Sequence, residues 1–356
     1  MSVTTTASPV TATASSPLVR ARLPRLAPAV AGVIAASAAG LVTLTLGAGL
    51  IAWAIVAVLL FSAVLPVWAL VVEGRRAAAD RLATSLVWTA FLIALVPLVS
   101  LLWTVLVKGA GAINSTFLTY SFYRTSMDQP VGIYHAIVGT LMITLFTAII
   151  SVPIGIMAAI YLVEYGAGSK IAATITFLVD VMTGIPSIVA GLFAYSLFAL
   201  LFGAGFNAGI GGSVALSLLM IPIVVRSSEE MLRLVPDDLR EAAYALGTPK
   251  WRTVVNVVLR TALGGIVTGV TLAIARVIGE TAPLLLVAGL TARTNFNVFD
   301  GFMSTLPVLI YSQFRKGTEG DFAIAWGAAL VLVVIVLILN VIARIVGKIF
   351  APKTGH

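Results

Sequence analysis

The chain alternates between long apolar stretches and short polar connections. Eight of these stretches approach or exceed the roughly 20 residues that a helix needs to cross a membrane. Uninterrupted apolar runs predict helices, because the strands of a membrane barrel would alternate between apolar and polar residues. The stretch 209–226 gives the weakest signal, since it is short and begins with several glycines. The predicted spans are 27–46, 50–72, 84–107, 133–163, 171–202, 209–226, 254–290 and 322–349.

Composition supports an all-α integral membrane protein. Hydrophobic residues make up 60% of the chain and charged residues only 10%, whereas soluble domains carry about 25% charged residues. The absence of cysteine excludes disulfides and thiolate chemistry. The two histidines, His135 and His356, are too few for a histidine-based metal site or catalytic triad. These features argue against a membrane-embedded enzyme.

The positive charges indicate the orientation of the chain in the membrane. Most of its 22 lysines and arginines lie on one side if eight helices cross the membrane and both termini share that side. Because cytoplasmic loops carry the excess of basic residues, both termini are predicted to be cytoplasmic. The net charge of +8 is then explained by the basic residues of the cytoplasmic loops, and no nucleic acid partner is expected. Two long loops, near 108–132 and 291–321, fall outside, where they either dock a partner or cap the bundle.

We divide the chain into four parts. Residues 1–25 are rich in Ser, Thr, Ala and Pro and lack acidic residues, which predicts a disordered cytoplasmic tail or, alternatively, a transit peptide. A cleaved signal peptide is disfavoured, because the apolar run that follows is too long and turns directly into a second one. Residues 26–82 form a transmembrane hairpin, 83–350 form the main transmembrane domain, and 351–356 form a second tail.

A short amphipathic helix is predicted on the cytoplasmic side near 237–250. Pro236 ends the preceding helix, and Asp238 and Glu241 have the spacing of a capping box. Gly247 fits a helix end. Apolar residues follow at positions i, i+3, i+4 and i+7, namely Leu239, Ala242, Ala243 and Leu246. Small alanines would let this helix fit a groove in another protein, although a linker lying against lipid is the alternative.

Two opposite charges occur within the seventh apolar stretch, at Arg276 and Glu280. An arginine at the centre of a bilayer costs about 2.5–3.5 kcal/mol, so it usually faces a partner or a water-filled cavity. Seven residues separate Gly269 from Arg276 and Ala273 from Glu280, which is nearly two helical turns. Both charges therefore continue a small-residue face suited to helix packing. They either line a pathway or form a structural i, i+4 salt bridge.

Four further residues can be interpreted from their positions in the sequence. Asp180 in the fifth span either lines the pathway or is a core acid near a helix end. Ser187 beside Pro186 marks either a helix break with exposed backbone donors or an ordinary proline kink. Glu164 and Lys170 are expected to be loop charges at the membrane interface.

Several motifs resemble a known family of transporters. The pattern of Glu241, Ala242 and Ala243 followed by Gly247 resembles the coupling-helix loop of ABC importer permeases, although Arg260 stands where that pattern has proline. Four wider stretches are similar to the PstA-type permease of phosphate-specific ABC importers, and the resemblance covers about residues 130–350. These stretches are REAAYALGTPKW, LAIARVIGETAPLL, GIMAAIYLVEYG (155–166) and IPSIVAGLF (185–193).

The resemblance implies a type I ABC importer permease in the cytoplasmic membrane of a prokaryote, with the N-terminal hairpin as an addition. It implies four partners: a related second permease subunit, a cytoplasmic ATPase dimer, an extracytoplasmic phosphate-binding protein and the lipid membrane. Glu241, Ala242, Ala243 and Gly247 would then engage the ATPase. ATP and Mg²⁺ would be used by the ATPase and no cofactor by this chain, whose Gly347-Lys348 lacks the rest of a phosphate-binding loop.

For a phosphate importer, the candidate pathway residues are Arg276, Glu280, Asp180 and Ser187. The guanidinium of Arg276 would attract the anion. Glu280 would pair with Arg276 in the empty path and accept the proton of hydrogen phosphate, which ionised sulfate lacks. One alternative is a permease for sulfate, molybdate or phosphonate. Another is a self-contained secondary transporter, which an internal repeat would favour, but the sequence shows no convincing repeat. A structural scaffold would not explain an intramembrane arginine.

Overall fold

The computed structural model describes residues 23–24, 26–47, 49–123 and 130–350. They form two compact units, residues 1–101 and 102–356, and the boundary falls inside one long helix, α3 (Arg75–Ala110). The predicted tails 1–25 and 351–356 lie almost entirely outside the described residues.

The first unit contains the predicted N-terminal hairpin. Its helices α1 (Ala27–Thr45) and α2 (Leu50–Val72) pack together, with α3 beginning at Arg75. Four alanines repeat every fourth residue along α1 and are almost completely buried: Ala27, Ala31, Ala35 and Ala39. Small residues at this spacing let two helix backbones approach closely. The indole of Trp53 on α2 adds a hydrogen bond to the carbonyl oxygen of Ala36, 3.0 Å away.

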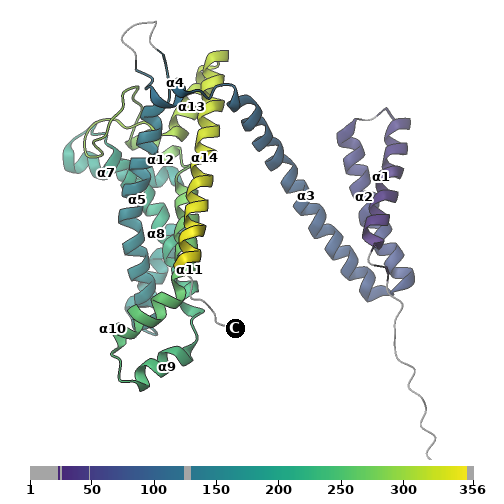
Figure 1. Cartoon of the computed structure of the whole chain (residues 1–356), viewed down its shortest axis with the longest axis horizontal. Coiled ribbons are helices and arrows are strands. Elements are labelled where there is room, and N and C mark those ends of the chain that lie inside the picture. The colour runs from purple at the N-terminus through teal and green to yellow at the C-terminus, as the bar shows by residue number, and fades with distance from the viewer. Residues whose placement is uncertain (1–22, 25, 48, 124–129, 351–356) are drawn as a thin grey trace, which may run out of the picture. The chain divides into compact units, whose positions relative to one another are not determined.

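The second unit is a helical bundle with α8 (Gly209–Arg233) at its centre (Figure 1). Helix α8 packs against α5, α6, α7, α11 and α12. Short π-helical turns, η1 (Tyr161–Tyr165) and η2 (Val254–Val258), adjoin α5 and α11. The remaining helices are α4 (Ser115–Thr119), α5 (Tyr134–Ile160), α6 (Lys170–Thr183), α7 (Ser187–Phe202), α9 (Asp237–Ala245), α10 (Lys250–Thr253), α11 (Leu259–Val277), α12 (Ala282–Val287), α13 (Leu306–Lys316) and α14 (Glu319–Phe350).

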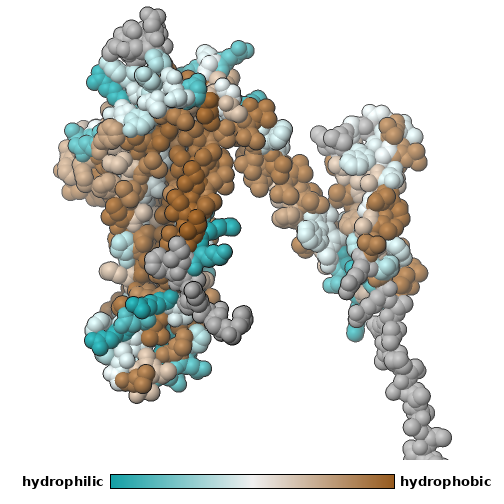
Figure 2. Space-filling view, viewed as in Figure 1, coloured by the Kyte–Doolittle hydropathy of each residue, from teal (hydrophilic) through white to brown (hydrophobic). Residues whose placement is uncertain are grey.

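Close packing around α8 depends on small residues. A methyl group added at Gly155 of α5 would lie 2.6 Å from a methyl carbon of Val224 on α8. The predicted packing face of α11 is present, since Gly269 abuts Ser227 of α8 and Ala273 is fully buried. In Figure 2 the bundle is hydrophobic along its middle and more polar at both ends, as expected of helices that cross a membrane.

Seven of the eight predicted spans coincide with helices that could cross a membrane, and the stretches 171–202, 209–226 and 254–290 differ in shape from the prediction. Seven helices are long and apolar enough to cross a membrane, and an eighth span results if α6 and α7 count as one broken span. The weakest prediction, 209–226, is the central helix α8, which continues to Arg233. The stretch 254–290 is not one continuous helix, because α11 ends at Val277 and α12 begins at Ala282.

The two long loops predicted to be extracytoplasmic lie at the same end of the bundle, opposite α9 (Figure 1). The first carries α4 and the second carries α13. They contact each other through a backbone hydrogen bond from Tyr123 to Ala292, 2.9 Å long. An isolated parallel bridge joins Ala208 to Gly301. This end therefore has a defined structure in its described part.

Candidate functional site

A cavity of about 200 Å³ brings together three of the four predicted pathway residues, Arg276, Glu280 and Ser187. Arg276 is exposed, and Glu280 and Ser187 are half-buried. Helices α6, α7, α8 and α11 all contribute to its wall. The remaining lining residues are Met182, Thr183, Ile185, Leu219, Pro222, Ile223 and Val277. The cavity therefore contains one cation, one carboxylate and two hydroxyl groups on an otherwise apolar wall.

A helix break separates the two charges. Arg276 lies in the last turn of α11, where a cation is stabilised by the negative end of the helix dipole. Pro283 has no amide hydrogen, and its ring would clash with a preceding helical turn. It is therefore tolerated in the first turn of α12 but would not fit inside a continued α11. Glu280 consequently lies in the connection and not one turn above Arg276. The expected ion pair between them is not formed in the described structure.

A second helix break forms another part of the cavity wall. Helices α6 and α7 are bent by 108° across Gly184, Ile185 and Pro186, so the predicted break beside Ser187 is confirmed. Pro186 has an extended backbone and directly precedes α7, which therefore starts at Ser187. The first amides of a helix carry a partial positive charge, which favours anions. Both the start of α7 and the guanidinium of Arg276 thus contribute positive potential to this cavity.

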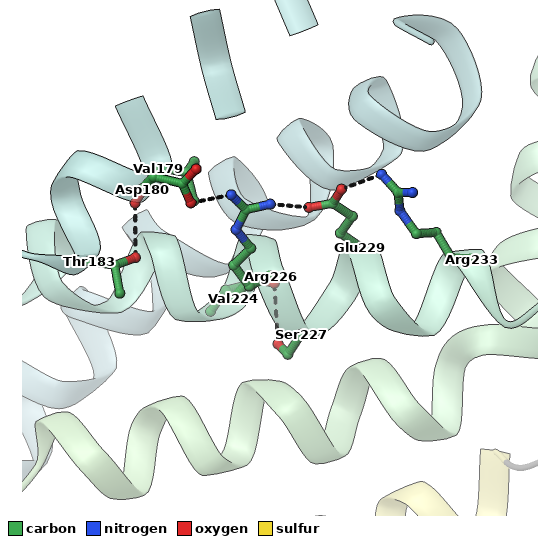
Figure 3. A network of polar contacts seen from close by, with 8 residues as sticks. All are labelled: Val179, Asp180, Thr183, Val224, Arg226, Ser227, Glu229 and Arg233. Atoms are coloured by element: carbon green, nitrogen blue, oxygen red, sulfur yellow. Dashed lines mark hydrogen bonds and ion pairs between the residues drawn. The ribbon is translucent and has the colours of Figure 1, made fainter. Parts of the chain in front are cut away.

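Asp180, the fourth predicted residue, belongs to a different cluster (Figure 3). Its carboxylate forms an ion pair with Arg226 of α8. Arg226 also donates to Glu229 at 2.9 Å, and Arg233 donates to the other oxygen of Glu229 at 2.7 Å. We call these four residues the charge network. Glu229 is buried while both outer residues, Asp180 and Arg233, are exposed.

The charge network lies along the same two helices as the cavity. Thr183 and Pro222 line the cavity, while Asp180 and Arg226 lie about one turn further along α6 and α8. Beyond them a second cavity of about 500 Å³ is lined by Thr176, Glu229 and Arg233 together with the loop before α6. The Asp180–Arg226 ion pair thus stands between two cavities on one seam of the bundle.

The predicted cytoplasmic helix is α9, and Gly247 ends it as expected. Gly247 has a φ of +75°, and the amides of Gly247 and Thr248 donate to the carbonyls of Tyr244 and Ala243. This geometry satisfies two carbonyl groups at the helix end. The side chains of Leu239, Ala242 and Leu246 are exposed, whereas Ala243 is buried against the rest of the chain.

The start of α9 differs from the prediction. The helix begins at Asp237 after Pro236 without a side-chain cap, so Asp238 and Glu241 do not form a capping box. Arg240 instead donates to the carbonyl oxygens of Leu232 and Val235 at 3.1 and 2.7 Å. Arg240 thus provides hydrogen-bond donors for carbonyl groups at the end of α8 and stabilises the turn between α8 and α9.

Arg240 also connects α9 to the end of α5. Its guanidinium lies 2.8 Å from the carboxylate of Glu164 in η1, and both side chains are largely buried. The expectation of loop charges at the interface was therefore wrong for Glu164. Lys170 is exposed as expected, but it is the first residue of α6 and not part of a loop. The sequence contained a signal for the charge network in the spacing of Arg226, Glu229 and Arg233, but none for the Arg240–Glu164 contact. No cluster of three or more possible metal ligands occurs in the described part of the chain.

Comparisons with known proteins agree with this architecture. Residues 151–356 match the family described as "Binding-protein-dependent transport system inner membrane component". The solved structure of a bacterial alginate ABC transporter, in complex with an alginate-bound periplasmic protein, has a chain with the same fold. Its TM-score is 0.56 at 14% identity, over 78% of this chain and 97% of that one. The fold and the family match define an ABC importer permease.

Curated relatives narrow the class. The chain is 46% identical over 274 residues to the phosphate transport system permease protein PstA 1 of Mycobacterium tuberculosis, covering 76% of this chain and 90% of that one. It is 48% identical over 271 residues to PstA of Mycobacterium leprae (76% and 88%) and 38% identical over 287 residues to PstA of Yersinia pestis (79% and 93%). The chain belongs to the PstA family of permeases.

Proposed function

We propose that this chain is the permease subunit of an ATP-driven importer of inorganic phosphate, and that the anion passes through the cavity at Arg276. The names of the relatives support the substrate. The observation that carries the site is the position of Arg276, whose guanidinium lines a cavity at two helix breaks and has no ion-pair partner among the described residues. A guanidinium without a carboxylate partner can bind phosphate oxygens through its planar fork of donors.

The other residues of the cavity have complementary roles in this proposal. Ser187 and the start of α7 offer hydrogen-bond donors to the anion. Glu280 accepts the proton of hydrogen phosphate, a contact that fully ionised sulfate cannot make. Because Glu280 is not held by Arg276, its carboxylate is available to a protonated substrate. This arrangement favours phosphate over sulfate at the same charge.

Transport requires that α9 respond to a separate motor. The exposed side chains of α9 would dock with a cytoplasmic ATPase, which uses ATP and Mg²⁺, and both termini would lie on that side of the membrane. Arg240 joins α9 to η1 and to the end of α8, so a displacement of α9 would move α8, which carries three of the four residues of the charge network. A related second permease and an extracytoplasmic phosphate-binding protein complete the proposed assembly.

Uptake of labelled phosphate at micromolar concentration tests the proposal. Cells lacking this chain should lose high-affinity phosphate uptake and keep sulfate uptake. The intact gene should restore the phosphate uptake. The variants Arg276→Gln and Glu280→Gln should fail to restore phosphate uptake although they reach the membrane in normal amounts.

Two results would contradict this proposal in different ways. Unchanged phosphate uptake without the chain, in cells with no redundant importer, would mean that the cargo is another oxyanion. Normal uptake by both variants would mean that the cavity at Arg276 does not lie on the pathway.

A further inference from the structure

The basic residues at the loop-bearing end of the bundle rest on aromatic rings. Four described cations lie 4.2–5.8 Å from a ring centre. None of them has an ion-pair partner in the described part of the chain, although Asp300, Glu319 and Asp321 belong to the same end. The pairs are Lys108 with Trp326, Arg293 with Tyr123, Arg315 with Tyr311, and Lys316 with Phe122. This end therefore presents positive charges that lie against aromatic rings and are not paired with carboxylates in the described part of the chain.

One of these cations lines a cavity of about 200 Å³ between the two long loops. Lys316 lies at its edge, 3.2 Å from the amide oxygen of Gln313. His135 lines the same cavity and is only 2% exposed. The other lining residues are Phe122, Leu290, Thr291, Ala292, Leu309 and Ser312, so the described wall contains no carboxylate.

Hydrogen bonds within the wall leave several donors available to a ligand. The Nδ1 atom of His135 accepts from the backbone amide of Phe122 at 3.2 Å, which places the proton of the neutral ring on Nε2. That Nε2–H has no partner among the described residues. The hydroxyl of Ser312 already donates to the carbonyl of Leu309 at 2.8 Å. The imidazole N–H and the Lys316 ammonium therefore remain as donors in a largely apolar cavity. The side-chain amide of Gln313 and the hydroxyl of Thr291, whose oxygens accept from Lys316 and from the Arg293 amide, can donate as well.

We propose that this cavity receives the carboxylate of an aspartate or glutamate that projects from the extracytoplasmic phosphate-binding protein. The Lys316 ammonium and the imidazole N–H can each donate to a carboxylate oxygen, and apolar walls suit the methylene groups of such a side chain. Arg293 and Arg315, at the same end of the bundle, add positive charges that favour an acidic partner. This inference rests on the proposed function, since it assigns the partner and places the two long loops outside.

The first test uses the reconstituted transporter and the phosphate-binding protein of the same organism. ATP hydrolysis is measured as a function of binding-protein concentration. The variant Lys316→Glu should raise the half-saturating concentration of the binding protein about tenfold or more and leave the maximal rate unchanged. The reason is that it loses a charge-assisted contact and adds repulsion. Lys170→Glu, at an exposed lysine at the other end of the bundle, is the matched control and should have no effect. Equal half-saturating concentrations for Lys316→Glu and the unmodified transporter would overturn the inference.

A second test identifies the acidic group itself. A carbodiimide, which joins amines to carboxylates in direct contact, should link Lys316 to one acidic residue of the binding protein, and Lys316→Gln should lose that link. Replacing this acidic residue by lysine should restore tight docking to Lys316→Glu. Linkage only at other lysines would contradict the inference. So would a shift in the half-saturating phosphate concentration at constant binding protein, which would indicate a free-phosphate site.

Failure of the inference can be distinguished from failure of the proposed function. If the unmodified transporter is not stimulated by the phosphate-binding protein, the proposed cargo or partner is wrong and the inference falls with it. If stimulation is normal and insensitive to Lys316→Glu, only the docking cavity is wrong. Because Lys316 is exposed, its variants are expected to fold. The test therefore needs no variant of the buried His135.

Discussion

The cavity at Arg276 and the charge network beside it use the same residue types in opposite ways. Both contain arginine and a carboxylate, and both involve α6 and α8. In the network, Glu229 is buried and binds two arginines, with Arg226 also bound to Asp180. In the cavity, Arg276 and Glu280 face a common space without forming an ion pair in the described structure. Only the second arrangement leaves charge available for a ligand.

The difference has a simple backbone origin. Arg226, Glu229 and Arg233 lie on one continuous helix, where side chains three and four residues apart are neighbours. Arg276 and Glu280 have the same spacing of four, but α11 ends at Val277 between them. Ending a helix between two opposite charges keeps them near each other and prevents their pairing. Variants of paired charges should therefore reduce stability, and variants of unpaired charges should reduce transport.

The largest loss of stability is expected at the most buried pair, Glu164 and Arg240. The variant Glu164→Gln would leave a buried guanidinium without its main carboxylate, at a cost of about 3 kcal/mol. The thermal unfolding of the purified protein in detergent measures this as a lower Tm. Asp237→Asn is the matched control, because Asp237 binds the same arginine from an exposed position and should change the stability by less than about 1 kcal/mol. Equal Tm values for the two variants would mean that burial does not decide the strength of these pairs.

A smaller loss is expected at the centre of the charge network. Glu229→Gln removes the carboxylate that binds Arg226 and Arg233, but both arginines reach solvent, so the cost should be about 2 kcal/mol. The neighbouring Glu230 is exposed, and Glu230→Gln should leave the Tm unchanged. If Glu229→Gln is as stable as Glu230→Gln and transports poorly, the network belongs to the pathway and not to the scaffold.

The positions of the spans could be predicted from the sequence, because long apolar runs and loop charges report directly on the membrane. The break at Ser187 and the end of α9 at Gly247 were also predictable, since proline and glycine have strong local preferences. Pairing between charges was not predictable. Glu164 and Arg240 are far apart in the sequence, and the distance between Arg276 and Glu280 depends on where α11 ends. Such contacts are set by tertiary packing.

The variant Arg276→Gln should separate stability from transport. Arg276 is exposed and has no ion pair to lose in the described structure. The free energy of unfolding should therefore change by less than about 0.5 kcal/mol, and the Tm should stay nearly the same. Phosphate uptake should fall roughly 10- to 100-fold, as expected for the loss of a hydrogen bond to a charged group. Arg344→Gln, at an exposed arginine of α14 that does not line the cavity, is the control and should transport normally. A large drop in Tm for Arg276→Gln would show that Arg276 supports the fold.

A small coupling energy is expected for the ion pair between Asp180 and Arg226. The carboxylate of Asp180 is 61% exposed, and solvent screens such a pair, so the coupling energy should be below about 1 kcal/mol. A double-mutant cycle with Asp180→Asn and Arg226→Gln, followed by thermal unfolding, measures this energy. The same variants report on the seam between the two cavities, where this pair stands. Weak coupling with slowed phosphate uptake in Asp180→Asn would make the pair a movable part of the pathway, whereas weak coupling with normal uptake would confine the pathway to the cavity at Arg276.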